Sequence, residues 1–398
     1  MLSVVGGQTP GRFAFPDRLW HPRRQFSVSH GSTLHMKKYL VTGGAGFIGS
    51  RLAKKLTAHG QVTVLDNLLP QVHAGNPDNV DRVRSCGATL IEADIRDREA
   101  LAAALNEAKP DVIYHLAAET GTGQSFDLPV RYNDVNVMGT ANLIEAVRSA
   151  VPDLERIVLA SSRSVYGEGA YVNDAGQQVL ASERRAEDME AGDFSVKCHA
   201  NQPLSPIPTN AACPVAPASI YASTKLMQEY LLHQAFWGTR TQIGLLRLQN
   251  VYGAGQSLNN PYTGVLSIFC RQIEEDRTLN IYEDGEIIRD FVHVDDVVSA
   301  FEMMGTVDTM PDGIIDIGSG EATSILVVAR LLLDLLDKPG DRYTITGAFR
   351  PGDIRYAVAD ISRATDELGW RPQIPLADGL SHLITWSRSE LQNAMASS

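Results

Sequence analysis

The chain has 398 residues, is 44% hydrophobic and 21% charged, and carries a formal net charge of −12. This composition is typical of a globular protein with one large or two modest domains. The negative charge disfavours a nucleic-acid partner, and no apolar run has membrane-spanning length.

Residues 1–35 differ from the rest of the chain, with four arginines, one acidic residue and no periodicity. They fit either a targeting leader or a disordered segment that is not native. We prefer the second interpretation, because the first predicted strand follows directly after Met36.

A strand at 38–42 leads into a glycine-rich loop and a helix at 50–59. The glycines fall at Gly43, Gly46 and Gly49, on either side of Phe47 and Ile48. They suit a tight turn, a close approach to a pyrophosphate and close packing of helix on strand. The loop therefore predicts a dinucleotide site at a helix N-terminus.

A second strand, 61–65, ends in Asp66, followed by Asn67. An acid here accepts hydrogen bonds from both ribose hydroxyls and repels a 2′-phosphate, which favours NAD over NADP. The strand at 88–93 leads to Asp94 and Ile95, which suit the adenine. The strand at 112–115 leads to small residues that would lie against the cofactor: Leu116, Ala117 and Ala118.

Strands and helices, including helices at 98–108 and 136–149, alternate up to about residue 165, which predicts a Rossmann-like, doubly wound parallel sheet of the α/β class. The strand at 156–160 leads to Ser161 and Ser162, and an irregular stretch at 168–218 predicts an ordered insertion or lid. A helix then carries Tyr221 and Lys225, one turn apart. A tyrosine moves a proton only if its pKa falls from about 10, and a neighbouring ammonium can lower it.

These patterns predict an NAD-binding domain over 36–250 and a smaller α+β, mainly substrate-binding domain over 251–398, from which 289–302 returns to the first. The four cysteines show no disulfide spacing and fit a reduced, cytoplasmic setting. Cys198, His199 and Cys213 lack a CxxC partner, so we expect free thiols and no metal.

Several motifs in this order resemble the extended short-chain dehydrogenases/reductases, and among them the NAD-dependent nucleotide-sugar epimerases and dehydratases. The motifs are the glycine loop, Asp94-Ile95, His115-Leu116-Ala117-Ala118, Ser161-Ser162, Tyr221-x-x-x-Lys225, Arg247-x-x-Asn250-Val251-Tyr252-Gly253 and Arg289-Asp290-Phe291-Val292-His293. The resemblance covers roughly residues 36 to 385.

The resemblance implies an isomerase that oxidises its sugar transiently at C4, with Tyr221 as the base. Ser162 would hydrogen-bond the same sugar oxygen. Lys225 would bind the nicotinamide ribose and, with the cofactor's charge, lower the pKa of Tyr221. NAD would stay bound, because each turnover regenerates it.

The resemblance also implies substrate contacts. Arg289 would grip the diphosphate and Asn250 would donate to it, while Arg350 and Asp353 would contact phosphate and ribose. Asn136 would support the backbone of the cofactor site, or it caps a helix.

Within the family, the segments 117–125, with Thr120, Gln124 and Ser125, and 250–264 resemble dTDP-L-rhamnose 4-epimerases. The Asp-Glu pair that dehydratases carry after the catalytic hydroxyl is replaced by Arg163 and Ser164, which favours epimerisation. The alternatives are a UDP-glucose or UDP-glucuronate 4-epimerase and a UDP-sugar decarboxylase, in which Arg163 could hold a carboxylate. A non-enzymatic NAD-sensing protein is a remote alternative. The resemblance further implies a homodimer.

Overall fold

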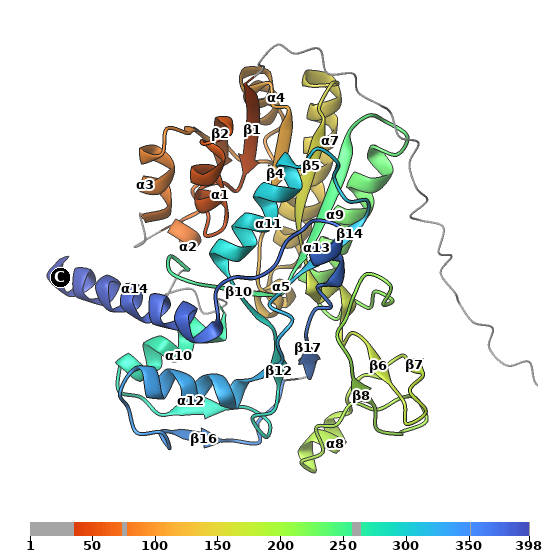
Figure 1. The fold of residues 1–398 in the computed structure, drawn as a ribbon, viewed down its shortest axis with the longest axis vertical. Helices are drawn as coiled ribbons and strands as arrows, with labels where there is room; N and C mark the ends of the chain where they lie inside the picture. The colour runs from red at the N-terminus through yellow and green to blue at the C-terminus, as the bar shows by residue number, and fades with distance from the viewer. Residues whose placement is uncertain (1–35, 74–77, 257–263, 351, 398) are drawn as a thin grey trace, which may run out of the picture. The chain divides into compact units, whose positions relative to one another are not determined.

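Seven parallel strands form the central sheet of the chain (Figure 1). Their order across the sheet is β14 (Ile314–Ile317), β9 (Gln242–Leu248), β5 (Arg156–Ser162), β4 (Val112–His115), β1 (Lys37–Thr42), β2 (Gly60–Asp66) and β3 (Thr89–Glu92). The predicted α/β fold with a doubly wound parallel sheet is confirmed.

The structure is a computed structural model that describes residues 36–73, 78–256, 264–350 and 352–397. The predicted leader, 1–35, lies outside the described residues. In the described ranges, no helix combines the length and the apolar character that crossing a membrane requires.

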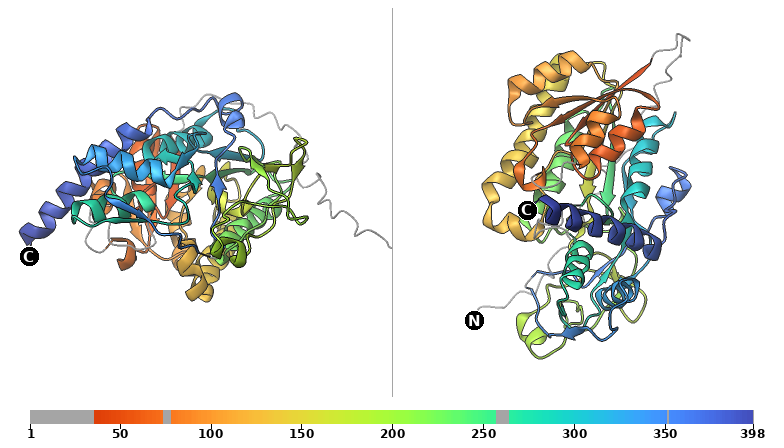
Figure 2. Two further views of the ribbon diagram at one scale, coloured as in Figure 1. Left: turned by 90° about the horizontal axis from the view of Figure 1, so that it is seen from below. Right: turned by 90° about the vertical axis from the view of Figure 1, so that its left-hand side faces the viewer.

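Helices cover both faces of the sheet, as the right-hand view in Figure 2 shows. One face packs against α1 (Gly49–Leu56), α3 (Asp78–Ser85) and α11 (Val294–Thr306). The other packs against α4 (Arg98–Ala108), α7 (Gly139–Ala150) and α9 (Ile220–Ala235). This double cover explains why the strands read as nearly continuous apolar runs, since both faces of each strand are buried.

The strand order reverses between β1 and β4. Thr42, at the end of β1, pairs with Leu65 of β2 on one side and with His115 of β4 on the other. In open parallel sheets a ligand binds in the crevice beyond the carboxyl ends of the strands at such a point. The topology thus places a binding crevice beside the glycine-rich loop.

The remaining helices and strands lie mainly after residue 250 and enclose a third apolar core. They include α10 (Val265–Glu274), α12 (Ile325–Leu335) and α14 (Leu376–Ser397), whereas α13 (Ser362–Asp366) packs through Ala364 into the core on one face of the central sheet. Three small sheets join β10 (Asn250–Tyr252) to β13 (Phe291–His293), β11 (Leu279–Ile281) to β16 (Tyr343–Ile345), and β12 (Ile288–Arg289) to both β15 (Thr323–Ser324) and β17 (Tyr356–Ala357).

The segment between β5 and α9 folds into a small sheet of its own, β7 (Gln178–Val179), β6 (Tyr171–Val172) and β8 (Ser205–Pro206), with helix α8 (Ala186–Glu190). Arg184 fastens this segment to the C-terminal region. Its guanidinium pairs with Glu283 at 2.9 Å, and the two side chains are only 4% and 1% exposed. Arg184 also donates to the Asp353 carbonyl oxygen at 2.7 Å.

Arg184→Ala should lower the free energy of unfolding by about 3 kcal/mol, because breaking a buried ion pair leaves a buried carboxylate with less compensation. Urea denaturation measures the change. Arg185→Ala is the matched control, since that neighbouring arginine forms an exposed pair with Asp188 and should matter little. Equal effects of the two substitutions would contradict the docking role of Arg184.

Candidate functional site

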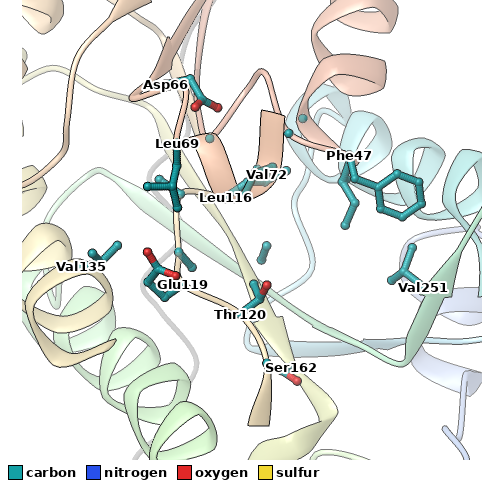
Figure 3. Close-up of a pocket in the computed structure, with 18 of the residues that line it drawn as sticks. Phe47, Asp66, Leu69, Val72, Leu116, Glu119, Thr120, Val135, Ser162 and Val251 are labelled. Carbon is teal, nitrogen blue, oxygen red and sulfur yellow. The ribbon is translucent and has the colours of Figure 1, made fainter. Parts of the chain in front are cut away.

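A cavity of about 490 Å³ opens at the carboxyl ends of β1, β2, β4 and β5. Figure 3 shows Asp66 at one end of it and Ser162 at the other. The predicted residues that line it are Gly43, Gly46, Phe47, Ile48, Gly49, Asp66, Asn67, Asp94, Ile95, Leu116, Ala117, Ala118, Thr120, Ser162, Tyr221, Lys225 and Asn250. One long crevice therefore joins the predicted cofactor residues to the predicted catalytic residues.

The glycine loop fits closely against the end of β4. Gly43 has a φ of +68°, and a Cβ added to it would lie 2.7 Å from the Ala117 nitrogen. A side chain would therefore meet backbone in a conformation that L-residues rarely adopt. Helix α1 begins at Gly49. Its first N–H groups suit an anion such as a pyrophosphate.

Asp66 joins the loop to the end of β2. Its carboxylate accepts hydrogen bonds from the backbone nitrogens of Ala45 (2.9 Å) and Leu68 (3.0 Å). Asn67 donates to Asp94 at 2.9 Å, and hydrogen bonds from Arg96 lower the pKa of Asp94 to about 2. The anchored Asp66 carboxylate lies where the acid of a dinucleotide fold receives a ribose, so the residues present fit NAD.

Sequence reasoning missed one wall of the cavity. Leu69, Val72 and His73 line it from the segment that contains α2 (Pro70–His73), and His73 Nε2 lies 3.5 Å from Asp66 Oδ1. A four-residue helix has too few positions for a periodic pattern, so no sequence signal marked it.

Ser162 ends β5 and caps the short helix η3 (Arg163–Tyr166), accepting a hydrogen bond from the Ser164 nitrogen at 3.2 Å. Tyr221 and Lys225 lie in the first turns of α9. The Ser162 side chain lies beside the Tyr221 hydroxyl, and both line the cavity. The ring of Tyr132 meets the Tyr221 ring edge-on, with centroids 6.4 Å apart.

The electrostatics differ from the expectation for Lys225. Burial raises the pKa of Tyr221, and the Ser162 hydrogen bond opposes that rise. Burial also lowers the pKa of Lys225 to about 7, against the attraction of Glu229. The Lys225 Nζ donates to the Ala160 carbonyl and to Gln228 Oε1, both at 2.9 Å. Desolvation thus outweighs the effect of Ser162 on Tyr221 and the attraction of Glu229 on Lys225.

Asn136 lies inside a π-helical turn, η2 (Asn133–Met138), and not at a helix cap. Its amide accepts from the Glu119 nitrogen at 2.8 Å and donates to the Glu119 carbonyl at 3.1 Å. It also donates to Thr224 at 2.9 Å. Asn136 therefore ties the cavity wall at Glu119 to the helix that carries Tyr221, although it is not itself a lining residue.

The predicted substrate residues divide into three groups, of which Arg289, Arg350 and Asp353 form the third. Thr120 and Asn250 line the cavity, whereas Gln124 and Ser125 are buried behind it. Gln124 accepts from the Tyr132 hydroxyl at 3.2 Å, and Ser125 donates to the Thr122 carbonyl at 2.6 Å. Residues 257–263 of the segment 250–264, which resembles dTDP-L-rhamnose 4-epimerases, lie outside the described residues.

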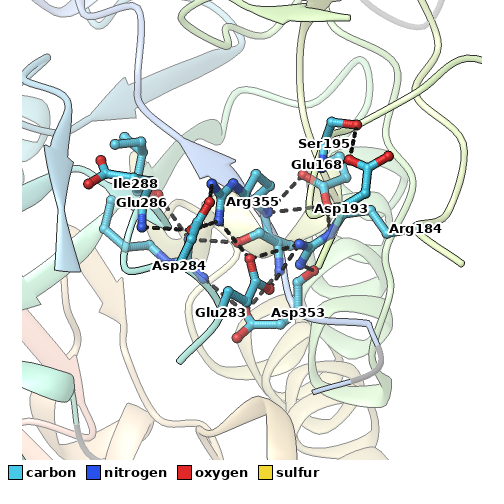
Figure 4. Close-up of polar contacts among 12 residues, drawn as sticks. Glu168, Arg184, Asp193, Ser195, Glu283, Asp284, Glu286, Ile288, Asp353 and Arg355 are labelled. Carbon is cyan, nitrogen blue, oxygen red and sulfur yellow. Dashed lines mark hydrogen bonds and ion pairs between the residues drawn. The ribbon is translucent and has the colours of Figure 1, made fainter. Parts of the chain in front are cut away.

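Arg289, Asp353 and Arg350 lie away from the cavity lining. Arg289 donates to Asp353 at 2.9 Å, while Arg350 is exposed and stacks over the Tyr282 ring, 4.8 Å from its centroid. Figure 4 shows Asp353 among Arg184, Glu283 and Arg355. Arg289 and Asp353 are therefore held by an ion pair with each other and by the hydrogen bond from Arg184 to the Asp353 carbonyl.

Arg163 is buried and donates to the Gly167 carbonyl at 2.8 Å. Burial, together with the nearby Arg289, lowers its pKa to about 10. It is not among the lining residues, so the structure does not place it to hold a substrate carboxylate in this cavity. In the ranges described, no cluster of three or more His, Cys, Asp or Glu side chains is arranged to hold a metal ion.

The chain matches the family model described as "NAD dependent epimerase/dehydratase family" over residues 39–190 and 194–318. It is 41% identical to a dTDP-L-rhamnose 4-epimerase of Burkholderia thailandensis over 366 residues, which cover 91% of this chain and 98% of the relative.

Two solved structures have the same fold. UDP-glucose 4-epimerase of Thermotoga maritima, determined with UDP-glucose, gives a TM-score of 0.71 at 28% identity, with 89% of this chain and 99% of that chain covered. UDP-glucose 4-epimerase of Thermus thermophilus, in complex with NAD, gives 0.70 at 27% identity, with coverages of 88% and 98%. The predicted resemblance and the predicted NAD cofactor are confirmed, and the chain belongs to the NAD-dependent epimerase/dehydratase family.

Proposed function

We propose that this protein is a 4-epimerase of a nucleotide-diphosphate sugar that interconverts dTDP-L-rhamnose and dTDP-6-deoxy-L-talose. The observation that carries the proposal is the meeting of Ser162, Tyr221 and Lys225 at one end of an NAD-type cavity, in a chain that is 41% identical to a dTDP-L-rhamnose 4-epimerase. A non-enzymatic NAD sensor would not need this set of proton-handling groups.

In the proposed reaction, Tyr221 takes the proton of the sugar 4-hydroxyl and later returns one. Ser162, beside Tyr221 in the cavity lining, donates to the same sugar oxygen and holds it in place. Lys225 in its charged form stabilises the phenolate. Bound NAD supplies the acceptor and donor for the hydride at C4. Lys225 is buried, which limits the access of bulk water to its ammonium group.

The residues after Ser162 support epimerisation over dehydration. Elimination of water needs a second acid and base beside the catalytic hydroxyl. Arg163 is instead turned to the Gly167 carbonyl, and the Ser164 hydroxyl is buried without a hydrogen-bond partner in the described structure. Arg163 and Ser164 therefore do not supply the acid and the base that elimination requires.

We further propose that Arg289 and Asn250 hold the substrate diphosphate, with Arg350 and Asp353 beside the nucleotide. Arg289 is held by Asp353 and by the Ile354 carbonyl at 2.7 Å. A phosphate is a bidentate partner that can replace the carboxylate, because it matches the same guanidinium fork. Thr120, on the cavity wall, faces the sugar in this arrangement.

A UDP-glucose or UDP-glucuronate 4-epimerase is the second candidate. The fold similarity to a UDP-glucose 4-epimerase of Thermotoga maritima favours it. A glucuronate substrate or a decarboxylation is less favoured than UDP-glucose. Arg163, the arginine beside Ser162 that could hold a carboxylate, is buried and does not line the cavity.

The protein would act as a homodimer in the cytoplasm, with an NAD-binding domain at 36–250, an insertion at 168–218 and a mainly substrate-binding domain at 251–398. Apolar side chains on α6 (Pro129–Tyr132), η2 and α9 support the dimer: Val130, Met138 and Met227 are 80%, 53% and 43% exposed. Since α6 and η2 pack against α9, these side chains belong to neighbouring helices.

Purified protein incubated with dTDP-L-rhamnose should yield a mixture with the 4-epimer, because the reaction is a reversible inversion at one carbon. NMR of the sugar signals measures the conversion. UDP-glucose and UDP-glucuronate serve as parallel substrates. Conversion of UDP-glucose alone would refute the deoxysugar assignment.

Tyr221→Phe should lower kcat by roughly 10²- to 10⁴-fold, because the ring remains but the proton acceptor is lost. Bound NAD, measured after denaturation of the purified protein, should stay at the wild-type level. Tyr132→Phe is the matched control, since that buried tyrosine meets the Tyr221 ring edge-on and its hydroxyl donates to the Thr120 carbonyl. A fully active Tyr221→Phe enzyme would refute the proposed base.

A further inference from the structure

Glu229 is a buried carboxylate that the proposed reaction does not use. It lies one helical turn after Lys225 in α9, and its side chain is only 1% exposed. Arg247 of β9 holds it through two hydrogen bonds, Nε to Oε1 at 2.9 Å and Nη2 to Oε2 at 2.6 Å. Burying two charges is costly even when they are paired, so the pair is a poor source of stability.

The same carboxylate reaches the strand that carries Ser162. Ser161, the residue directly before Ser162, donates its hydroxyl to Glu229 Oε1. Ser161 of β5 also pairs in register with Arg247 of β9. Glu229 thus links α9, β5 and β9 beside the end of β5, where Ser161 and Ser162 line the cavity.

The charges around Lys225 come from several elements. Residues i and i+4 of a helix are neighbours on one face, so Glu229 is the carboxylate nearest along α9. On β4, burial lowers the pKa of His115 to about 3, so this imidazole is neutral. Tyr221 is neutral in the resting site because burial raises its pKa.

Beyond Arg247 lies a second layer of polar groups. The Arg247 guanidinium stacks on Tyr166, 4.5 Å from the ring centroid, and the Tyr166 hydroxyl donates to Asp316 at 2.9 Å. Burial raises the pKa of Asp316 to about 7, so this carboxyl is half-charged near neutral pH. Glu229 is therefore the carboxylate that lies between the two cations, Lys225 and Arg247.

We propose that Glu229 is a positioning residue for Lys225 and Ser162: its carboxylate lies one turn from the buried Lys225 ammonium on the same helix and, through Ser161, fixes the strand end that presents Ser162. The inference rests on the proposed roles of Lys225 and Ser162. The cost of burying the Glu229–Arg247 pair thus serves to hold a negative charge and a fixed strand end beside Lys225 and Ser162, which an apolar pair would not provide.

The first test is a titration of Lys225, which needs no substrate. The protein carries lysine labelled with ¹³C at Cε, and Lys225→Met assigns the signal. In the wild-type chain the midpoint lies near the pKa of about 7 that burial produces. Glu229→Gln removes a stabilising negative charge, so Lys225 should lose its proton at a lower pH.

Glu283→Gln is the matched control, because Glu283 is equally buried and also pairs with an arginine, Arg184, but it lies in the C-terminal region. It should leave the Lys225 midpoint unchanged. An unchanged midpoint in Glu229→Gln, or the same change in both variants, would overturn the proposal.

Glu229→Asp keeps the charge but shortens the side chain, and it also serves if Glu229→Gln fails to fold. Its Lys225 midpoint should stay near that of the wild type, while kcat falls and KM does not, because the shorter carboxylate cannot reach Ser161 and Arg247 together. A wild-type kcat, or a midpoint at lower pH, would overturn the proposal. If no nucleotide sugar is converted by the wild-type chain, the proposed function fails, but the titration still decides the role of Glu229.

Discussion

Burial of the Lys225 ammonium at the carboxyl edge of a parallel sheet is the constraint on which the site depends. A lysine out of water tends to lose its proton, and burial here brings its pKa to about 7. The surroundings must therefore supply acceptors. Ala160 and Gln228 provide them by direct hydrogen bonds, and Glu229 provides a negative charge. The same helix also carries Tyr221 beside Ser162. Helix α9 therefore positions Tyr221, Lys225 and Glu229 together.

The acceptors are themselves held by residues far away in the chain. Gln228 donates to Thr140 at 2.8 Å, and Thr140 lies 2.9 Å from the neutral His115, whose other ring nitrogen lies 2.8 Å from Thr42. This network runs from α9, which carries Tyr221 and Lys225, to the strand that leads into the glycine loop. It couples the position of Lys225 to the position of the cofactor site through buried, paired groups, which are rigid because leaving any of them unpaired is costly.

The sequence was sufficient where function depends on local spacing. Gly43, Gly46 and Gly49 lie within one turn between strand and helix, and Tyr221 and Lys225 are one helical turn apart. Short sequence motifs were therefore enough to predict that these residues share one cavity. The sequence was insufficient where the partner is distant. Gln124 and Ser125 carry polar groups that could bind a sugar, and only the fold turns them to Tyr132 and Thr122. Arg289 and Asp353 are 64 residues apart, and no local pattern predicts that they pair.

That last pair bears on how a nucleotide diphosphate could be recognised. The Arg289 guanidinium is already satisfied by Asp353 and two backbone carbonyls, and Asp353 lies on a loop that Arg184 of the inserted segment holds. A ligand phosphate must therefore compete with an existing carboxylate, and the gain from binding is the difference between two charge-assisted contacts. Such an exchange gives modest affinity for a lone phosphate, because one anion replaces another. It favours a ligand that makes further contacts in the cavity, where Asn250 and Thr120 lie, so selectivity would come from the sugar end and not from the charge.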